Sequence, residues 1–181
     1  MNIRPSVGSD SAGIDRVLLT AFGDPEGPEI VALVTGLLND ASAQPALSLV
    51  AEIDDTIVGH VLFTRARLLP DHDNLAVQVL APLAVAEGLQ GRGTGAALVR
   101  EGLRQLAASG VDLVFVLGHP QYYPRFGFRP AGAQGMDAPY PIPERHADAW
   151  MVQALRPGLL GRVRGTVRCA DTLNDPRHWR E

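Results

Sequence analysis

Apolar residues recur at helical spacing in two segments near the start of the sequence. The first set comprises Ile14, Val17, Leu18, Ala21 and Phe22. The second set comprises Ile30, Leu33, Val34, Leu37 and Leu38. Because such positions share one face of an α-helix, we expect two consecutive amphipathic helices. The Ser/Asp cluster at 9–11 is suited to cap the first helix, and the stretch "GDPEGP" separates it from the second.

The pattern then changes to β-type runs. "LSLVAEI" and "TIVGHVLFTRARLL" flank Asp54 and Asp55, which predicts a hairpin. A third run predicts a strand over 75–85, yet it contains Pro82, which lacks the N–H that a ladder uses. We therefore expect this strand to lie at an edge, to carry a bulge, or to part from its neighbour after Pro82.

A glycine-rich loop, a helix and another strand follow. Residues 88–95, "GLQGRGTG", hold four glycines in eight positions, and Gly110 is placed to end the helix that comes next. "VDLVFVLG" is a continuous apolar run, which is typical of a strand covered on both faces. This βαβ order predicts that strands 75–85 and 111–117 are parallel neighbours. "AWMVQAL" and "GRVRGTVRCA" predict two further strands.

This order of elements predicts one α/β (α+β) domain over residues 1–181, with a core at about 1–135 and a strand-rich arm at about 136–181. The net charge is −4, so nucleic acid is not expected as a partner. Cys169 is the single cysteine, no signal peptide is visible, and no apolar stretch reaches membrane-spanning length. We therefore expect a cytoplasmic protein without a membrane partner.

The histidines are too far apart for the usual metal-binding motifs. They are His60, His72, His119, His146 and His178. Neither His-x-x-x-His nor Cys-x-x-Cys spacing occurs, and we expect no metal site.

The glycine-rich loop is suited to hold an anion. Bare backbone that leads from a strand into the amino end of a helix presents free N–H groups and the positive end of the helix dipole. A phosphate or pyrophosphate is the natural ligand. The alternative is that the glycines only allow a tight turn and close helix packing.

Two familiar phosphate motifs fit this loop poorly. The sequence contains no lysine, which excludes a Walker motif. Gly91, Gly93 and Ala96 match the loose dinucleotide fingerprint, with Asp112 about twenty residues further on. However, Asp112 opens its strand, whereas the fingerprint needs an acid where the strand ends.

A better match is to the GNAT superfamily, the GCN5-related N-acetyltransferases. "QGRGTG" at 90–95 resembles that family's coenzyme loop, "PLAV" resembles its fourth strand, and "QYYPRFGFRP" resembles its second signature. The form read from Gly118 to Phe128 is similar to the YhbS-like bacterial subgroup. The resemblance implies a GNAT-type fold, with a mixed central sheet that splays between its fourth and fifth strands and is flanked by helices.

The resemblance also implies which residues meet acetyl-CoA, the expected cosubstrate. Backbone N–H groups would grip its pyrophosphate at Gln90, Gly91, Arg92, Gly93, Thr94 and Gly95. The backbone of Leu83, Ala84 and Val85 would pair with the pantetheine arm, and an amide near Val85 would face the thioester oxygen. A fixed donor there stabilises the negative charge that develops during acyl transfer. The alternative for these three residues is a plain core strand.

Tyr123 occupies the position of the family's proton-donating tyrosine and would protonate the departing coenzyme A thiolate. Its alternative role is packing, which is the favoured interpretation of Tyr122. Arg125 either meets a coenzyme phosphate or faces solvent. Phe126 and Phe128 are expected in the core.

The sequence does not identify the general base or the acceptor. The candidates for the base are Glu52, Glu87, His119 and ordered water. In the family, acceptor specificity comes from the first two helices with their loop and from the last strands. The acids of that loop either contact a cationic amine or stabilise a helix start. They are Asp24, Glu26 and Glu29.

The resemblance implies an N-acetyltransferase that transfers the acetyl group of acetyl-CoA to a primary amine by direct attack in a ternary complex. The acceptor would be a small molecule or a peptide, and a homodimer is left open. A non-catalytic acyl-CoA-binding or sensing module is the alternative from another class. A dinucleotide oxidoreductase is disfavoured by the position of the motif.

Overall fold

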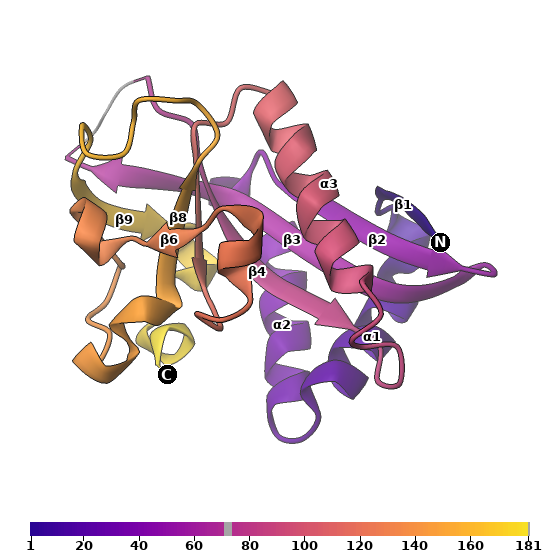
Figure 1. The fold of residues 1–181 in the computed structure, drawn as a ribbon. Helices are drawn as coiled ribbons and strands as arrows, with labels where there is room; N and C mark the ends of the chain where they lie inside the picture. Colours follow the sequence, from indigo (N-terminus) through magenta and orange to yellow (C-terminus); the bar gives the residue numbers. More distant parts are fainter. Residues whose placement is uncertain (71–73, 181) are drawn as a thin grey trace.

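A mixed β-sheet forms the centre of the computed structural model, which describes residues 1–70 and 74–180 (Figure 1). The strands are β1 (Asn2–Pro5), β2 (Leu47–Ile53), β3 (Thr56–Leu69), β4 (Val77–Val85), β5 (Leu113–Leu117), β6 (Arg129–Pro130), β7 (Met136–Asp137), β8 (Trp150–Ala154) and β9 (Gly165–Cys169). The α-helices are α1 (Ser11–Phe22), α2 (Glu26–Leu38) and α3 (Thr94–Ala108). Short 3-10 turns lie at Gly8–Asp10, Ala41–Ala43, Tyr123–Phe126, Gly132–Gln134, Glu144–Ala149, Asp171–Leu173 and Pro176–Trp179.

The strands follow the order β1-β2-β3-β4-β5-β8-β6, and β9 pairs with both β3 and β7. The β4–β5 pair is parallel, as the βαβ order predicts, whereas the other pairs along that path are antiparallel. The predicted hairpin is confirmed. Asp54 and Asp55 have φ values of 49° and 62°, the left-handed pair that a tight two-residue turn between twisted strands requires.

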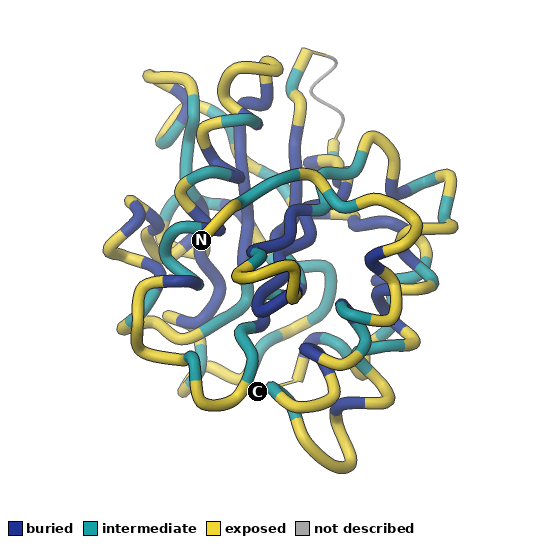
Figure 2. Tube along the Cα trace, turned by 90° about the vertical axis from the view of Figure 1, so that its right-hand side faces the viewer, coloured by how far each residue is buried: buried dark blue, intermediate teal, exposed yellow. Residues whose placement is uncertain are grey.

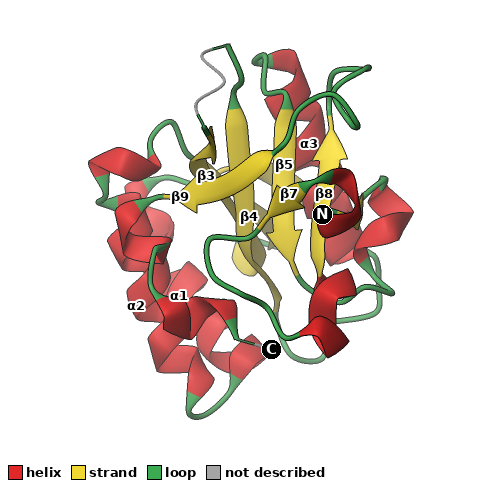
Figure 3. Cartoon of the chain, turned by 90° about the vertical axis from the view of Figure 1, so that its left-hand side faces the viewer, coloured by secondary structure: helices red, strands yellow, loops and turns green. Residues whose placement is uncertain are grey.

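Helices cover both faces of this sheet (Figure 3). The helical stripes read from the sequence are confirmed except at Leu38, which is exposed: α1 and α2 bury theirs in one core, and α3 packs on the opposite face in a second core. Close approach of α3 depends on Gly102, where an added Cβ would collide with the ring of Phe63. Figure 2 shows that buried residues run through the central strands. Gly110 ends α3 with a φ of 91°, as expected.

Asp10 does not cap α1 with its side chain, contrary to our expectation. Its carboxylate instead accepts the N–H of Val7 at 2.8 Å and pairs with Arg4 at 2.8 and 2.9 Å. These contacts, led by the Arg4 guanidinium, lower the pKa of Asp10. The acid therefore fastens the short turn before the helix to β1.

Pro82 lies in a β-bulge inside the sheet. On β3 the partner residues run from Val61 to Phe63, while on β4 they run from Leu83 to Leu80, so Ala81 and Pro82 together face a single residue. The parallel ladder between β4 and β5 ends at Leu80. The bulge is observed, and β4 also parts from β5, although this separation begins before Pro82. The expectation of an edge strand is wrong, because β4 lies between β3 and β5.

Candidate functional site

The glycine-rich loop ends at the amino terminus of α3 with its backbone uncovered. Gly88, Gly91 and Gly93 have φ values of 88°, 76° and 89°, and no side chain caps the helix at Gly93. Added Cβ atoms at Gly91 and Gly93 would meet only open space. The first N–H groups of a helix have no intrahelical partner, and the helix dipole adds partial positive charge there. This end of α3 is therefore suited to bind an anion.

Thr94 contributes only its backbone to this end of the helix. Its side chain is buried and points at β3, where its methyl group would lie 3.2 Å from a Cβ added at Gly59. The loop thus presents main-chain groups, which is the arrangement that its composition predicts.

Beyond Leu80, β4 has an open edge on the side that faces away from β3. Ala86 donates its N–H to the carbonyl of Val58 at 2.8 Å. In an antiparallel ladder the direction of the backbone groups alternates, so the N–H and C=O of Val85 point away from β3, and those of Leu83 do likewise. The Val85 carbonyl meets the side chain of Gln90, which donates to it at 3.1 Å. That contact confirms the direction, because it approaches from the side opposite β3.

Ala84 departs from the expected arrangement. It stands opposite His60 in the β3–β4 ladder, and the same alternation turns its N–H and C=O toward β3. Of the three residues expected to pair with a pantetheine arm, Leu83 and Val85 present backbone to the open edge and Ala84 does not.

Tyr123 lies in the 3-10 turn after β5, is only 7% exposed, and packs against Phe126, Phe128 and Tyr122. An added Cβ at Gly118 would collide with its ring, so the glycine leaves room for the tyrosine. Among the described residues its hydroxyl has no hydrogen-bond partner. Burial is the main cause that raises its pKa, and the phenol is therefore protonated at neutral pH.

The neighbours of Tyr123 are mainly structural. Phe126 and Phe128 are buried, as expected. Tyr122 is half-buried, and its hydroxyl lies 2.9 Å from the position of a Cβ added at Gly95. The guanidinium of Arg125 stacks 4.5 Å from the Tyr122 ring centroid, and its Nε donates to the Tyr122 carbonyl at 2.8 Å. Arg125 thereby braces this turn.

A cavity of about 710 Å³ connects the open edge of β4 to Tyr123. Its lining contains Ala81–Leu83, the end of β5 and Tyr123. It also contains Glu26 and Glu29 from the first turn of α2, together with residues 177–180. Asp24 is not part of the lining.

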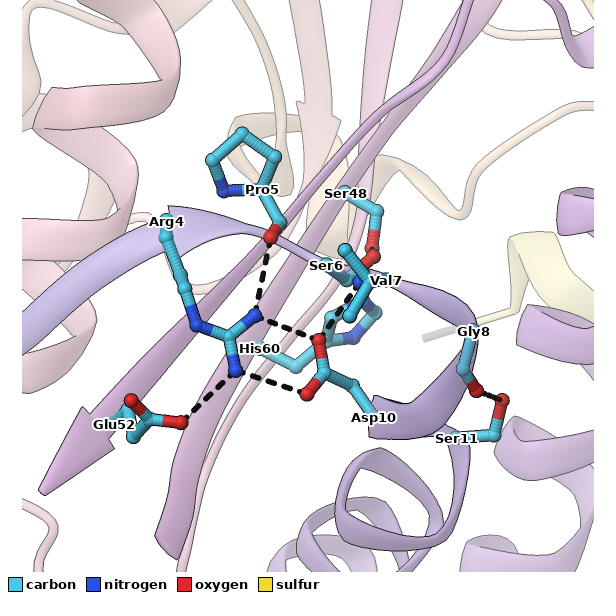
Figure 4. A network of polar contacts seen from close by, with 10 residues as sticks. All are labelled: Arg4, Pro5, Ser6, Val7, Gly8, Asp10, Ser11, Ser48, Glu52 and His60. Carbon is cyan, nitrogen blue, oxygen red and sulfur yellow. Dashed lines mark hydrogen bonds and ion pairs between the residues drawn. The ribbon is translucent and has the colours of Figure 1, made fainter. Parts of the chain in front are cut away.

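The candidates for the general base lie in different places. Glu52 is held at 2.9 Å by Arg4 in a network with Asp10 (Figure 4), and it does not line the cavity. Glu87 is exposed in the turn after β4 and is also absent from the lining. His119 is exposed and does line the cavity.

The network in Figure 4 also contains a buried histidine. His60 stands opposite Ala84 in the ladder, and its Nε2 lies 2.9 Å from the hydroxyl of Ser48. Burial lowers the pKa of His60 to about 4, so this imidazole is neutral at pH 7.

Residues 177–180 line the cavity although no sequence motif points to them. They follow a 3-10 turn that Asp40 holds against α2: the Asp40 carboxylate accepts both the N–H and the hydroxyl of Thr172, at 2.9 and 2.7 Å. The short 3-10 turns at Asp171–Leu173 and Pro176–Trp179 have no periodic hydrophobic pattern that a sequence could reveal. The contact between Asp40 and Thr172 also joins positions that lie 132 residues apart. No local signal in the sequence indicates it.

Asp112 has a structural role that accounts for its position. Its carboxylate accepts the N–H of Ala76 at 2.8 Å and the Nε of Arg156 at 2.8 Å. The acid therefore joins the starts of β4 and β5, and it does not stand where a ribose-binding acid would be needed.

Within residues 1–70 and 74–180, no three His, Cys, Asp or Glu side chains group closely enough to hold a metal ion, and His72 lies outside those residues. In the same part of the chain, no helix is both long and apolar enough to span a bilayer.

Known proteins are similar to this chain in sequence and in architecture. The sequence model of the acetyltransferase (GNAT) domain family matches residues 2–131 of this chain. The chain is 47% identical over 164 residues to the uncharacterized N-acetyltransferase YjhQ of Escherichia coli K12, covering 90% of this chain and 88% of YjhQ. It is 33% identical over 175 residues to the uncharacterized N-acetyltransferase YhbS of the same strain, covering 96% and 99%.

Solved structures agree with the sequence matches. The crystal structure of E. coli YhbS in complex with CoA superimposes with a TM-score of 0.84 at 31% identity, covering 96% of this chain and 92% of that one. A GNAT family acetyltransferase from Brucella melitensis in complex with acetyl-CoA has a TM-score of 0.75 at 28% identity, covering 95% and 97%. The chain thus belongs to the GNAT superfamily and is an acetyl-CoA-dependent N-acetyltransferase.

Proposed function

We propose that this protein transfers the acetyl group of acetyl-CoA to a primary amine by direct attack in a ternary complex. The observation that carries the proposal is the shared cavity: the open edge of β4 and the protonated phenol of Tyr123 line the same space. The uncapped start of α3 follows β4 along the chain. One extended donor could therefore bind its pyrophosphate at α3 and its acyl group at the edge of β4.

The backbone holds the donor in this proposal. The amides from Gln90 to Gly95 bind the pyrophosphate, aided by the dipole of α3. The pantetheine arm adds to the open edge of β4 at Leu83 and Val85, much as a peptide adds to the edge of a sheet. The expected oxyanion donor was an amide near Val85; of the two outward-facing residues, Leu83 lines the cavity that holds Tyr123, so its N–H faces the thioester oxygen and stabilises the negative charge of the tetrahedral intermediate.

The chemistry needs one proton donor and one proton acceptor. The amine nitrogen attacks the thioester carbon and forms the C–N bond, and the C–S bond then breaks. The Tyr123 phenol donates its proton to the departing sulfur, and the proton lost by the attacking nitrogen passes to a base. The base restores the phenol through solvent between turnovers.

Release of free coenzyme A thiol from acetyl-CoA tests the function directly. The acceptors are a panel of primary amines: leucine amide, 2-phenylethylamine, spermidine and a short lysine-containing peptide. We expect thiol release that depends on at least one amine, together with the matching acetylated product by mass spectrometry. Tight acetyl-CoA binding with no amine-dependent release would instead support a non-catalytic sensing module.

We also propose a single domain with a cytoplasmic location. The sheet supports the first point, because β8 and β9 of the carboxyl-terminal arm pair with β5 and β3 of the core. A homodimer stays open, as the sequence left it.

A further inference from the structure

Residues 177–180 bring a second histidine into the cavity from the far end of the chain. His178 is half-buried and lines the same cavity as Glu29 and Tyr123 (Figure 3 shows the carboxyl end of the chain beside the helical layer of α1 and α2). Nothing in the family resemblance assigns a role to this residue.

We propose that His178 is the general base that removes the proton of the acceptor's ammonium, and that Glu29 stabilises the imidazolium that forms. This inference rests on the proposed function. The imidazole nitrogen takes one ammonium proton first, which frees the lone pair of the amine nitrogen to form its bond to the thioester carbon. As the C–S bond breaks, the second proton lost by this nitrogen passes through solvent to restore the Tyr123 phenol. The imidazolium then releases its proton to solvent, so the net reaction yields the amide, the coenzyme A thiol and one proton.

The turn that carries His178 is fixed in place. His178 donates its backbone N–H to the carbonyl of Asp175 at 3.1 Å. The indole of Trp179 is buried, donates to the carbonyl of Leu173 at 2.9 Å, and packs 5.5 Å from the Trp150 ring. With Thr172 held by Asp40, the imidazole is attached to a rigid wall.

The position of His178 favours it over His119. His119 is exposed and precedes Tyr123 by four residues, in a turn in which the Tyr122 and Tyr123 N–H groups bond back to the His119 carbonyl. It therefore shares a turn with the proton donor. His178 adjoins Trp179, which packs in the core on the α1–α2 face of the sheet, whereas Tyr123 packs in the core on the α3 face, so the two side chains reach the cavity from different cores.

The charges around His178 suit a base. Burial and the Arg177 guanidinium lower its pKa, whereas Asp175 and Glu29 raise it, and the net result lies below the usual 6.5. The imidazole is thus neutral at pH 7 and free to accept a proton. The other charged or titratable residues that line the cavity are Glu26, His119, Tyr123 and Arg180.

The pH dependence of turnover follows from these signs. Activity requires neutral His178, so kcat/KM should fall as the pH drops through the pKa of His178. Glu29→Gln removes a charge that raises this pKa, so the acidic limb should move to lower pH. Arg177→Gln removes a charge that lowers it, so the limb should move to higher pH. A residue with a purely structural role would not produce opposite shifts.

The experiment measures thiol release against pH, with the best amine of the panel, in the wild type and the variants. His178→Gln should lower kcat/KM at pH 7 by ~10²-fold or more, the usual contribution of a general base. It should also lose the acidic limb and keep the wild-type calorimetric affinity for acetyl-CoA. His146→Gln is the matched control, because His146 is half-buried outside the cavity and should leave the rate unchanged.

The outcomes separate the two levels of the proposal. If the wild type acetylates no amine, the proposed function fails, and this inference fails with it. If the wild type is active and His178→Gln retains its rate and acidic limb, His178 is not the base. Should His178→Gln fail to fold, the pH profiles of kcat/KM for Glu29→Gln and Arg177→Gln test the inference instead. Acidic limbs that shift in the same direction in both variants, or that do not shift, overturn it.

Discussion

A Gly93→Asp variant is expected to bind acetyl-CoA about 100-fold more weakly or worse while it remains folded. Gly93 is the last residue before α3, its φ is 89°, and a Cβ added there would lie in open space. Asp tolerates this left-handed conformation better than most residues. Its carboxylate would lie where the pyrophosphate is proposed to bind. Like charges about 4 Å apart repel by about 4 kcal/mol near a protein surface, and about 1.4 kcal/mol is a factor of ten in affinity.

Gly110→Asp provides the matched control at the opposite end of the same helix. Gly110 has a φ of 91° and equally open surroundings, so the backbone strain is the same. The added negative charge is favourable at the start of α3 and unfavourable at its end. We therefore expect Gly93→Asp to be the more stable of the two in urea unfolding and yet the one that loses acetyl-CoA in calorimetry. Equal affinities of the two variants for acetyl-CoA would show that the glycine-rich loop does not bind the pyrophosphate.

A Tyr123→Phe variant is expected to keep its affinity for acetyl-CoA within a few fold and to lose ~10²–10⁴-fold in kcat. The ring contacts with Phe126 and Phe128 remain, and the hydroxyl that is removed has no hydrogen-bond partner within residues 1–70 and 74–180. A general acid typically contributes a factor of that size. Because burial raises the pKa of Tyr123, its ionisation should produce no loss of activity below about pH 10.

Tyr122→Phe is the control for the neighbouring ring. It changes the same chemical group one position earlier, and we expect its kcat to stay within a few fold of the wild type. Single-turnover kinetics must show that chemistry limits the rate in each case. A Tyr123→Phe enzyme with full single-turnover rate would restrict Tyr123 to packing.

Sequence patterns were most informative where the structure is local. The helical stripes, the Asp54–Asp55 hairpin and the βαβ unit each depend on neighbouring residues, and all are present. Pro82 indicated an irregular strand because a residue without an N–H cannot donate to the ladder, and a sheet can take it only at an edge, a bulge or a break in the pairing. The start of the opening could not be located, since it depends on where β5 ends its pairing with β4.

Contacts between distant residues could not be read from the sequence. Glu52 was a reasonable base by residue type alone, but its partner Arg4 lies 48 positions away in the chain. Asp40 and Thr172 place His178 in the cavity across an even longer separation. The roles of such residues are decided by packing, and a single sequence contains no pattern that reveals it.

Hydrogen exchange at the Val85 amide tests the central claim, that the open edge of β4 receives the donor. The N–H of Val85 points away from β3, whereas that of Ala84 points toward it, so adjacent residues provide the probe and its control. At saturating acetyl-CoA, exchange at Val85 should slow strongly, while Ala84 and Val114, already within ladders, should change little. Unchanged exchange at Val85 in a protein shown by calorimetry to be saturated would contradict the account, because the pantetheine arm would then not lie along this edge.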